Sequence, residues 1–246
     1  MEWWIQMIAY TSLVIGSYLI GSLQTGWFLG KIIKQIDIRD FGSGNTGFSN
    51  VYRILGKGPA IITLIGDIFV KGFVVVWAVR LIVTYLVLDP QPSIGSPLSI
   101  YTMGLTTPLS QGMIVLSGLM AVAGHNWPIW FGFKGGKGMA TTAGVFFAIA
   151  PATVAGLAIV WLIIVKTTRY TSLANIIATP ISSIFFFLEA FFIMGPEVVW
   201  YPLPIGGLAA GLLVLFSHRE NIKRLHAGEE RKFGDKTERL KQKEEE

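Results

Sequence analysis

The sequence contains no cysteine and is poor in charged side chains, which make up 14% of its 246 residues. Without cysteine the chain cannot form disulfides, thiolate nucleophiles or cysteine-based metal sites. Its three histidines, His125, His218 and His226, are not spaced as metal ligands, so no metal site is expected. Soluble domains carry about 25% charged residues, whereas here hydrophobic residues reach 52% and the mean hydropathy is +0.57. These proportions indicate a protein with several membrane spans.

Positive charge is missing from particular loops. Residues 89–110 and 190–203 contain no lysine or arginine, whereas cations crowd 31–58, 132–138, 166–172 and the C-terminal end. Because cytoplasmic loops of membrane proteins are enriched in cations, the four basic segments are expected on the cytoplasmic side. The net charge of +5 fits this distribution and does not indicate nucleic-acid binding.

Long apolar runs predict the membrane helices. A helix crosses the bilayer with about 20 residues, so the chain has room for about seven spans. We expect a membrane domain over residues 1–225 and a charged cytoplasmic tail over 226–246. The first run has no basic region before it and is interpreted as a span, not as a signal peptide. The apolar runs cover residues 3–30, 59–88, 111–129, 139–165, 173–193 and 204–216.

The run 139–165 begins and ends next to basic loops, so it cannot be a single span. Pro151 interrupts it, and a proline inside a helix ends or kinks that helix. We therefore expect two short helices that fold back at Pro151. With this hairpin the sequence predicts an all-α membrane protein of seven transmembrane helices, with its N-terminus outside and its C-terminus in the cytoplasm. The polar, glycine-rich loops then meet at one face.

One of these loops, residues 41–58 (FGSGNTGFSNVYRILGKG), combines closely spaced glycines with polar side chains and two cations. The glycines let the backbone turn and present its N–H groups to an anion. Ser43, Asn45 and Asn50 add side-chain donors, and Arg53 is the first of the two cations. The loop suits an oxyanion such as phosphate, and an ordinary exposed interhelical loop is the alternative.

A second glycine-rich loop, residues 132–138 (GFKGGKG), places Lys137 at a predicted helix start, where backbone donors and an ammonium group favour phosphate. It does not match the nucleotide-binding P-loop, and a plain positive-inside loop is the alternative. His218 and Asn221 follow the last apolar run and share a helix face because they are three residues apart. His218 is interpreted as a candidate base, or otherwise as an ordinary interfacial residue.

Charged side chains within apolar runs are costly in a bilayer, and they are usually paired or functional. Asp67 and Lys71 are four residues apart on one helix face and can satisfy each other. Arg80 is expected to extend toward the interface, and His125 is interpreted as part of an interfacial turn. A transporter for a phosphorylated metabolite would also need phosphate loops, but its site would lie at mid-membrane and not on one face.

Several long segments, in order, resemble the PlsY family of bacterial acyl-phosphate:glycerol-3-phosphate acyltransferases over nearly the whole chain. GDIFVKG and RYTSLANI are similar to family segments. The family more often has Ala-Thr where this chain has Phe48 and Ser49, and serine where it has Asn175. The three segments that are similar to the family's signatures are GSGNTGFSNVYRILGKG (42–58), GHNWPIWFGFKGGKGMAT (124–141) and HRENIKRLHAGEE (218–230).

The resemblance implies the reaction. A long-chain acyl phosphate would donate its acyl group to the 1-hydroxyl of glycerol 3-phosphate, giving lysophosphatidic acid and phosphate in the first acylation of phospholipid biosynthesis. It also implies seven helices in a bacterial plasma membrane, with membrane lipid as a partner and no metal or other cofactor. We expect the active site on the cytoplasmic face.

The predicted site combines this resemblance with the chemistry of the residues. The general base stays open between His218 and a phosphate oxygen of the donor. Ser172 is a weaker candidate near the donor carbonyl, and Asn221 is expected on the glycerol hydroxyls with His218. The expected catalytic residues are His218, Lys137 and Ser43. The expected substrate-binding residues are Asn45, Asn50, Arg53, Lys137, Ser172 and Asn221.

Overall fold

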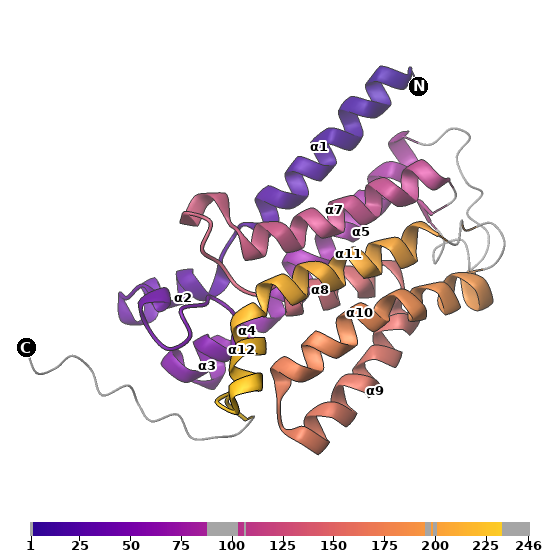
Figure 1. Cartoon of the computed structure of the whole chain (residues 1–246). Coiled ribbons are helices and arrows are strands. Elements are labelled where there is room, and N and C mark those ends of the chain that lie inside the picture. Colours follow the sequence, from indigo (N-terminus) through magenta and orange to yellow (C-terminus); the bar gives the residue numbers. More distant parts are fainter. Residues whose placement is uncertain (1, 88–102, 106, 195–197, 199–200, 233–246) are drawn as a thin grey trace, which may run out of the picture.

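The computed structural model describes residues 2–87, 103–105, 107–194, 198 and 201–232, and within these ranges its regular secondary structure is entirely helical (Figure 1). The expected all-α class is therefore confirmed for this part of the chain. The helices are α1 (Trp3–Gly21), α2 (Thr25–Lys34), η1 (Ile38–Asp40), α3 (Phe48–Leu55), α4 (Lys57–Ile65), η2 (Gly66–Val74), α5 (Val75–Ile82), η3 (Val83–Val87), α7 (Pro108–Asn126), η4 (Ile129–Phe131), α8 (Met139–Ile149), α9 (Pro151–Thr168), α10 (Thr171–Glu189), η5 (Ala190–Met194), α11 (Pro202–Ser217) and α12 (Arg219–Ala227).

Five helical stretches are long and apolar enough to cross a membrane. Two more apolar helices, Met139–Ile149 and Pro202–Ser217, are shorter, and each falls below the ~20 residues of a full span. A multi-pass protein is thus established, while seven crossings and their orientation stay predictions. The five long stretches are Trp3–Lys34, Lys57–Tyr85, Pro108–Phe131, Pro151–Thr168 and Thr171–Met194.

The first predicted span, 3–30, lies within the apolar stretch Trp3–Lys34, but this stretch is not one continuous helix, because α1 ends at Gly21 and α2 begins at Thr25. Gln24 lies fully buried in the break. Its amide donates to the backbone carbonyls of Ser22 and His125, both at 3.3 Å, and its carbonyl accepts from Thr46 at 2.5 Å. The break therefore joins α1, α7 and the first glycine-rich loop.

The predicted interruption at Pro151 is confirmed, since α8 ends at Ile149 and Pro151 opens α9. Proline suits this first helical position because its missing N–H would have no partner there. Glu189 of α10 accepts from the backbone N–H groups of Ala152 (3.3 Å) and Thr153 (2.5 Å), which caps α9. With its 18 residues α9 is not short, and it packs mainly against α10 while α8 packs against η2.

Arg80 does not extend toward the interface as expected. Its side chain is buried, and Nε donates to the carbonyl of Met103 at 3.0 Å. The guanidinium also hydrogen-bonds to the carbonyl of Ala148, in the last turn of α8. The last carbonyls of a helix lack helical partners, so Arg80 satisfies a group that the break at Pro151 leaves open.

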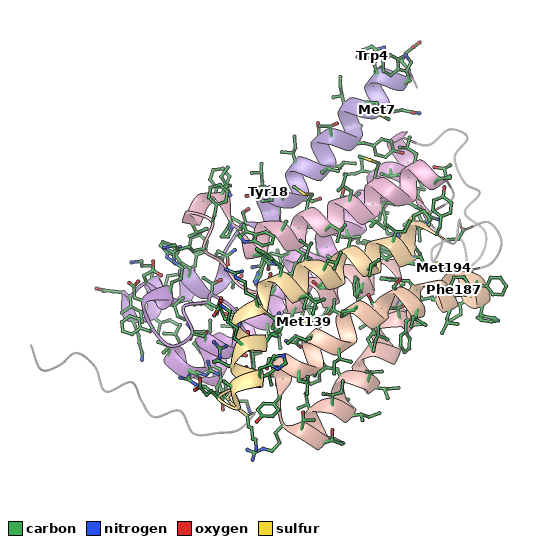
Figure 2. All side chains as sticks on the ribbon, viewed as in Figure 1. Trp4, Met7, Tyr18, Met139, Phe187 and Met194 are labelled. Carbon is green, nitrogen blue, oxygen red and sulfur yellow. The ribbon has the colours of Figure 1, made fainter. Side chains whose placement is uncertain are left out.

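The outer surface of the bundle is apolar. Large hydrophobic side chains such as Ile8, Ile184 and Leu212 are 58–60% exposed, which suits contact with lipid acyl chains. Figure 2 shows Trp4 and Met7 near the end of α1, where this helix extends away from the other helices. Apolar exposure of this extent supports a membrane environment for the helices.

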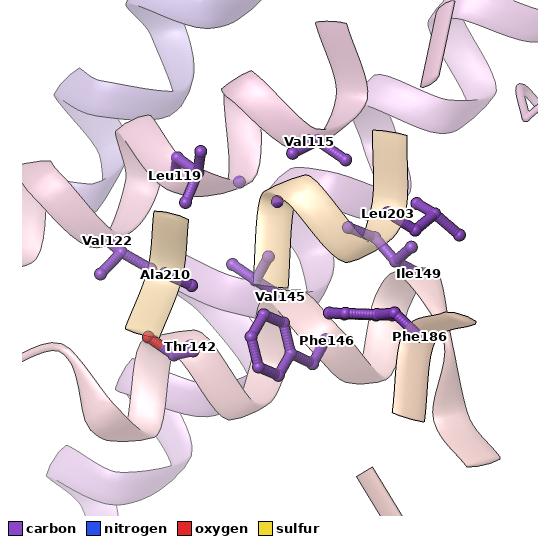
Figure 3. A pocket seen from close by; sticks show the side chains of 12 residues that line it. Val115, Leu119, Val122, Thr142, Val145, Phe146, Ile149, Phe186, Leu203 and Ala210 are labelled. Carbon is purple, nitrogen blue, oxygen red and sulfur yellow. The ribbon is translucent and has the colours of Figure 1, made fainter. Parts of the chain in front are cut away.

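A small apolar pocket lies between α7, α8, α10 and α11 (Figure 3). Its lining includes Val122, Phe146 and Phe186, and Thr142 contributes an oxygen. None of the predicted site residues lines it. The pocket is therefore packing space within the bundle and is separate from the polar site described next.

Candidate active site

The polar loops gather at one end of the molecule. Figure 1 places α2, α3, α4 and α12 at this end. Hydrogen bonds from Arg39 to the Phe131 carbonyl and from Lys137 to Asn221 bring the two glycine-rich loops and α12 together there. The sequence thus correctly anticipates that these segments meet, although the roles of the individual residues stay predictions.

Asn50 organises the first glycine-rich loop. It is buried, and its amide donates to the carbonyls of Ile38 (3.0 Å), Phe41 (3.1 Å) and Asn45 (2.9 Å). Its oxygen accepts from the backbone N–H of Ser43 at 2.8 Å. Both the amide nitrogen and the oxygen of Asn50 are therefore engaged within the loop, and its predicted contact with substrate stays a prediction.

Ser43 and Asn45 lie at the surface of this loop. Asn45 Nδ2 donates to the Ser43 carbonyl (3.0 Å) and to its hydroxyl oxygen (3.3 Å). Gly42 and Gly44 on either side have positive φ, +62° and +71°, which a side chain would disfavour. The turn therefore exposes the Ser43 hydroxyl toward solvent, where a substrate phosphate could reach it.

Lys137 contacts α12. Its ammonium group hydrogen-bonds to the Asn221 oxygen, and Asn221 Nδ2 donates to Glu230 Oε1 at 2.7 Å. Arg224 Nε also donates to Glu230, at 2.8 Å. Burial, assisted by the charge of Arg224, lowers the pKa of Lys137 to about 8. The lysine is therefore still mostly charged at pH 7, as an anion-binding group must be.

Glu230 is a site residue that sequence reasoning missed. Burial acts to raise the pKa of its carboxyl, but the hydrogen bonds from Asn221 and Arg224 leave it below the usual range. The predicted residue Ser172 is buried on α10 and faces Glu230, without a hydrogen bond of normal geometry. The only signal in the sequence is the position of Glu230 in the tail, which does not indicate a fold back onto Asn221.

His218 lies between α11 and α12 and is buried. Its Nδ1 is 2.9 Å from the carbonyl oxygen of Val214, and its Nε2 is 3.4 Å from Asn175 Nδ2. Burial, followed by the charge of Lys137, lowers the pKa of His218 to about 4. The imidazole is therefore neutral at physiological pH.

Arg53 on α3 is half-buried and faces the same cluster of charges. Burial and the charge of Arg231 lower its pKa, which Glu230 partly offsets. Within the described residues its side chain forms no hydrogen bond or ion pair. Arg53 is thus a cation without a close counter-ion, which fits its predicted role in phosphate binding.

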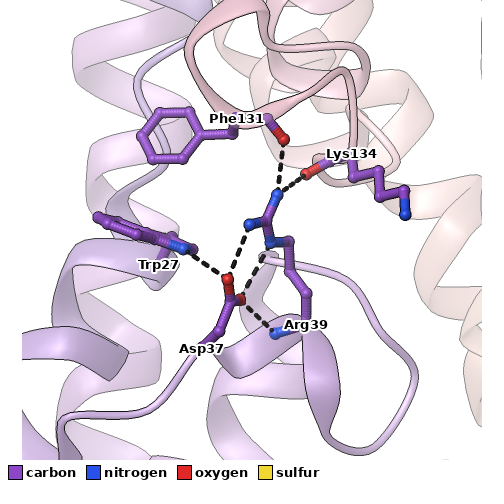
Figure 4. A network of polar contacts seen from close by, with 5 residues as sticks. All are labelled: Trp27, Asp37, Arg39, Phe131 and Lys134. Carbon is purple, nitrogen blue, oxygen red and sulfur yellow. Dashed lines mark hydrogen bonds and ion pairs between the residues drawn. The ribbon is translucent and has the colours of Figure 1, made fainter.

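Arg39 ties the two glycine-rich loops together (Figure 4). Its Nε and NH2 groups donate to the two oxygens of Asp37 at 3.0 and 2.7 Å, and NH1 donates to the carbonyl of Phe131 at 2.6 Å. Trp27 also donates to Asp37, at 3.0 Å. The guanidinium holds the pKa of Asp37 well below its usual range. Sequence reasoning missed this link because its acceptor is a backbone carbonyl 92 residues away.

A buried network of polar side chains lies against the second glycine-rich loop, residues 132–138. Asp67 and Lys71 form an ion pair at 2.5 Å, as their spacing predicted, and Lys71 Nζ is 2.9 Å from His125 Nδ1. His125 is a buried residue of α7, so its interpretation as an interfacial turn residue is wrong. The backbone N–H of Gly136 donates to its carbonyl at 3.0 Å, and a Cβ on Gly136 would collide with its ring.

Groups of three or more His, Asp or Glu side chains that could hold a metal ion are absent from the described residues. The fold and this site define a multi-pass helical membrane protein with cations and amides arranged for an anionic ligand at one end. The model of the glycerol-3-phosphate acyltransferase family matches residues 11–228, and the chain belongs to this family.

Relatives share most of their length with this chain. A glycerol-3-phosphate acyltransferase of Gloeobacter violaceus is 36% identical over 89% of this chain and 92% of its own. The Aquifex aeolicus enzyme is 36% identical, with coverages of 90% and 97%. Two crystal structures of PlsY (YgiH), an integral membrane glycerol 3-phosphate acyltransferase, are 34% identical over 92% of this chain, with TM-scores of 0.72 for the glycerol 3-phosphate form and 0.70 for the lysophosphatidic acid form.

Proposed function

We propose that this protein transfers the acyl group of a long-chain acyl phosphate to the 1-hydroxyl of glycerol 3-phosphate. The hydroxyl oxygen bonds to the carbonyl carbon, the carbon–oxygen bond to phosphate breaks, and lysophosphatidic acid and inorganic phosphate are released. An acyl phosphate is already activated, so the chain needs no cysteine nucleophile. The observation that carries the proposal is the hydrogen bond of Lys137 to Asn221 together with the electrostatic interaction of Lys137 with His218, at the end of the bundle where the two glycine-rich loops lie.

The geometry supports distinct roles for these residues. Lys137 and Arg53 are cations beside the loop that exposes Ser43, an arrangement suited to a phosphate group and to the negative charge that develops on the carbonyl oxygen. His218 is neutral and can accept a hydrogen bond from the glycerol hydroxyl. The hydroxyl proton ends on His218 or on the departing phosphate, and both keep the reaction balanced.

The apolar surface of the helices supports a lipid-derived donor. Exposed hydrophobic side chains lie near the polar end of the bundle, since Tyr52 directly precedes Arg53 and Phe216 is two residues before His218. A long acyl chain can remain in the bilayer while its phosphate reaches the loops. We place the protein in a bacterial plasma membrane. Its polar end faces the cytoplasm in this proposal, because the basic segments lie at that end and cytoplasmic loops are enriched in cations.

The direct test measures phosphate release by purified protein supplied with acyl phosphate and glycerol 3-phosphate. We expect release to require both substrates and to match the formation of lysophosphatidic acid. Replacing acyl phosphate by acyl-CoA should give no product. Uptake of glycerol 3-phosphate into vesicles by counter-flow, without lysophosphatidic acid formation, would instead identify a transporter.

A further inference from the structure

The position of the proton on His218 follows from its neighbour on α11. Nδ1 lies 2.9 Å from the Val214 carbonyl oxygen, which can only accept a hydrogen bond. Nδ1 must therefore carry the hydrogen and donate it. In a neutral imidazole the lone pair then lies on Nε2, so Nε2 is the nitrogen that can accept a hydrogen bond or a proton.

The orientation of the Asn175 amide follows in the same way. Trp161 Nε1 lies 2.8 Å from Asn175 Oδ1, and an indole N–H can only donate. Oδ1 therefore faces Trp161, and the amide nitrogen faces His218. Asn175 Nδ2 lies 3.4 Å from His218 Nε2, so it donates toward the lone pair. A hydrogen bond of this length is weak and easily exchanged.

We propose that Trp161 and Asn175 position His218 for catalysis, with the Asn175 amide occupying the Nε2 lone pair until the acceptor hydroxyl replaces it. A buried lone pair without a donor costs free energy, and the amide fills this place in the empty site. Trp161 holds the amide oxygen and so prevents it from turning toward Nε2. An amide oxygen beside Nε2 would need a hydrogen on that nitrogen, because the oxygen can only accept. The identity of the incoming hydroxyl rests on the proposed function, whereas the assignment of the nitrogens does not.

The charges around His218 agree with a neutral ring. Lys137 faces it from the loop before α8 and disfavours the imidazolium form, while Glu230, after α12, favours that form. From α10 the ring faces the neutral amide of Asn175. A carboxylate at position 175 would add a negative charge and an acceptor next to Nε2, and both effects favour a proton on that nitrogen.

The test is Asn175→Asp, which keeps the size of the side chain and the acceptor for Trp161. Because the chain has only three histidines, 15N-histidine NMR in detergent resolves His218, and His218→Asn identifies its signals. We expect the wild-type ring to carry its hydrogen on Nδ1 and to stay neutral down to about pH 5. In Asn175→Asp we expect protonation of Nε2 at a pH higher by about 1–3 units, the effect of an opposite charge nearby.

Kinetics give the second measurement. At pH values below the raised pKa of His218, where Nε2 is protonated, Asn175→Asp should lower kcat for acyl transfer strongly and leave KM for the acyl phosphate nearly unchanged. Trp161→Phe, which frees the amide to turn, should lower kcat about fivefold, the effect of one ordinary hydrogen bond. Trp130→Phe is the control, since Trp130 is exposed and lies outside the site, and it should match the wild type.

Three results would overturn the proposal. They are a wild-type ring with its hydrogen on Nε2, an unchanged His218 titration in Asn175→Asp, and wild-type kcat in Trp161→Phe. The NMR signals report on the ring whether or not acyl transfer occurs. If the proposed function fails, the wild-type protein will be inactive and His218 will still carry its hydrogen on Nδ1. If this proposal fails, the protein will be active and His218 will carry its hydrogen on Nε2.

Discussion

Lys137 and Lys134 carry the same charge in one loop, but their surroundings differ. Lys137 is partly buried and bonded to Asn221, whereas the Lys134 side chain is exposed and bonds to no other side chain within the described residues. A preorganised charge in a buried site stabilises a transition state more than a charge in water does. The two lysines therefore separate a specific contact from a diffuse positive surface.

We predict that Lys137→Ala lowers kcat/KM for acyl transfer by at least ~100-fold, the scale of losing one preorganised electrostatic contact. Lys134→Ala should lower it only slightly. Initial rates of phosphate release at varied glycerol 3-phosphate concentrations provide the measurement. Losses of equal size in the two variants would show that the loop acts only through its overall charge.

The pH dependence of kcat/KM should follow the shifted pKa values of two site residues. Protonation of His218, with a pKa of about 4, removes its lone pair, so activity should fall at acid pH near 4 and not near the usual 6.5. Lys137 loses its charge above its pKa of about 8, so activity should fall again at alkaline pH. Rates measured from about pH 3 to 10 give both limbs.

Two variants assign these limbs. Lys137→Arg, whose guanidinium stays charged, should retain some activity and shift the alkaline limb upward. His218→Asn should lose most of the activity, by about 10²–10⁴-fold if His218 is the general base, and should lose the acid limb as well. An acid limb that persists in His218→Asn would assign that limb to a substrate phosphate.

The sequence indicated which residues are candidates for the site more readily than it indicated what each of them contacts. Lys137, Asn221 and His218 stand out because their neighbours in the sequence are glycine, a cation or the end of an apolar run. Their partners are set by the folded chain. Glu230 reaches Asn221 from beyond the end of α12, and the low pKa of His218 depends on burial and on Lys137, which is 81 residues earlier in the sequence.

At the scale of elements, the network of Asp67, Lys71 and His125 joins the η2 segment to α7. All three side chains are at most 4% exposed. An unpaired charge at a buried position is costly, and removing one partner of a buried ion pair destabilises a protein by about 3–5 kcal/mol. Removing both partners is far less costly.

Lys71→Met should therefore lower the thermal unfolding temperature in detergent clearly, and the double variant Asp67→Asn, Lys71→Met should recover most of the loss. The exposed pair of Lys223 and Glu220, at 3.2 Å, is the control. Lys223→Met should shift the unfolding temperature very little, since exposed pairs contribute roughly 0–1 kcal/mol. Additive losses from Asp67 and Lys71 would show that the two charges do not depend on each other.

Helix boundaries were predictable where a single residue determines them. Proline fixes its own backbone and removes a donor, so Pro151 marks the end of α8 in the sequence itself. The break after Gly21 has no such residue. It depends on Gln24, whose amide is satisfied by Ser22 and by His125, a residue of another helix. A contact between distant segments cannot be read from local composition.

For the whole molecule, hydropathy and loop charge predicted the all-helical membrane class and the gathering of the polar loops, because both follow from properties that the bilayer imposes on every span. The orientation and the number of crossings stay predictions. Several positions that would report on them, Ser96, Pro196 and Lys236, lie outside the described residues. The absence of native cysteine makes single introduced cysteines clean reporters at other positions.

The strongest test of the topology concerns the two helices on either side of Pro151. Lys134 precedes α8 and Lys166 lies in the last turn of α9, and both are exposed. If α8 and α9 together enter and leave the membrane from one side, cysteines at these positions must be labelled from the same side. We predict that an impermeant reagent reaches Lys134→Cys and Lys166→Cys only after cell lysis, and reaches Glu2→Cys in intact cells. Labelling of only one of the two lysine positions in intact cells would mean that α8 and α9 cross once in total, and the count of seven spans would be wrong.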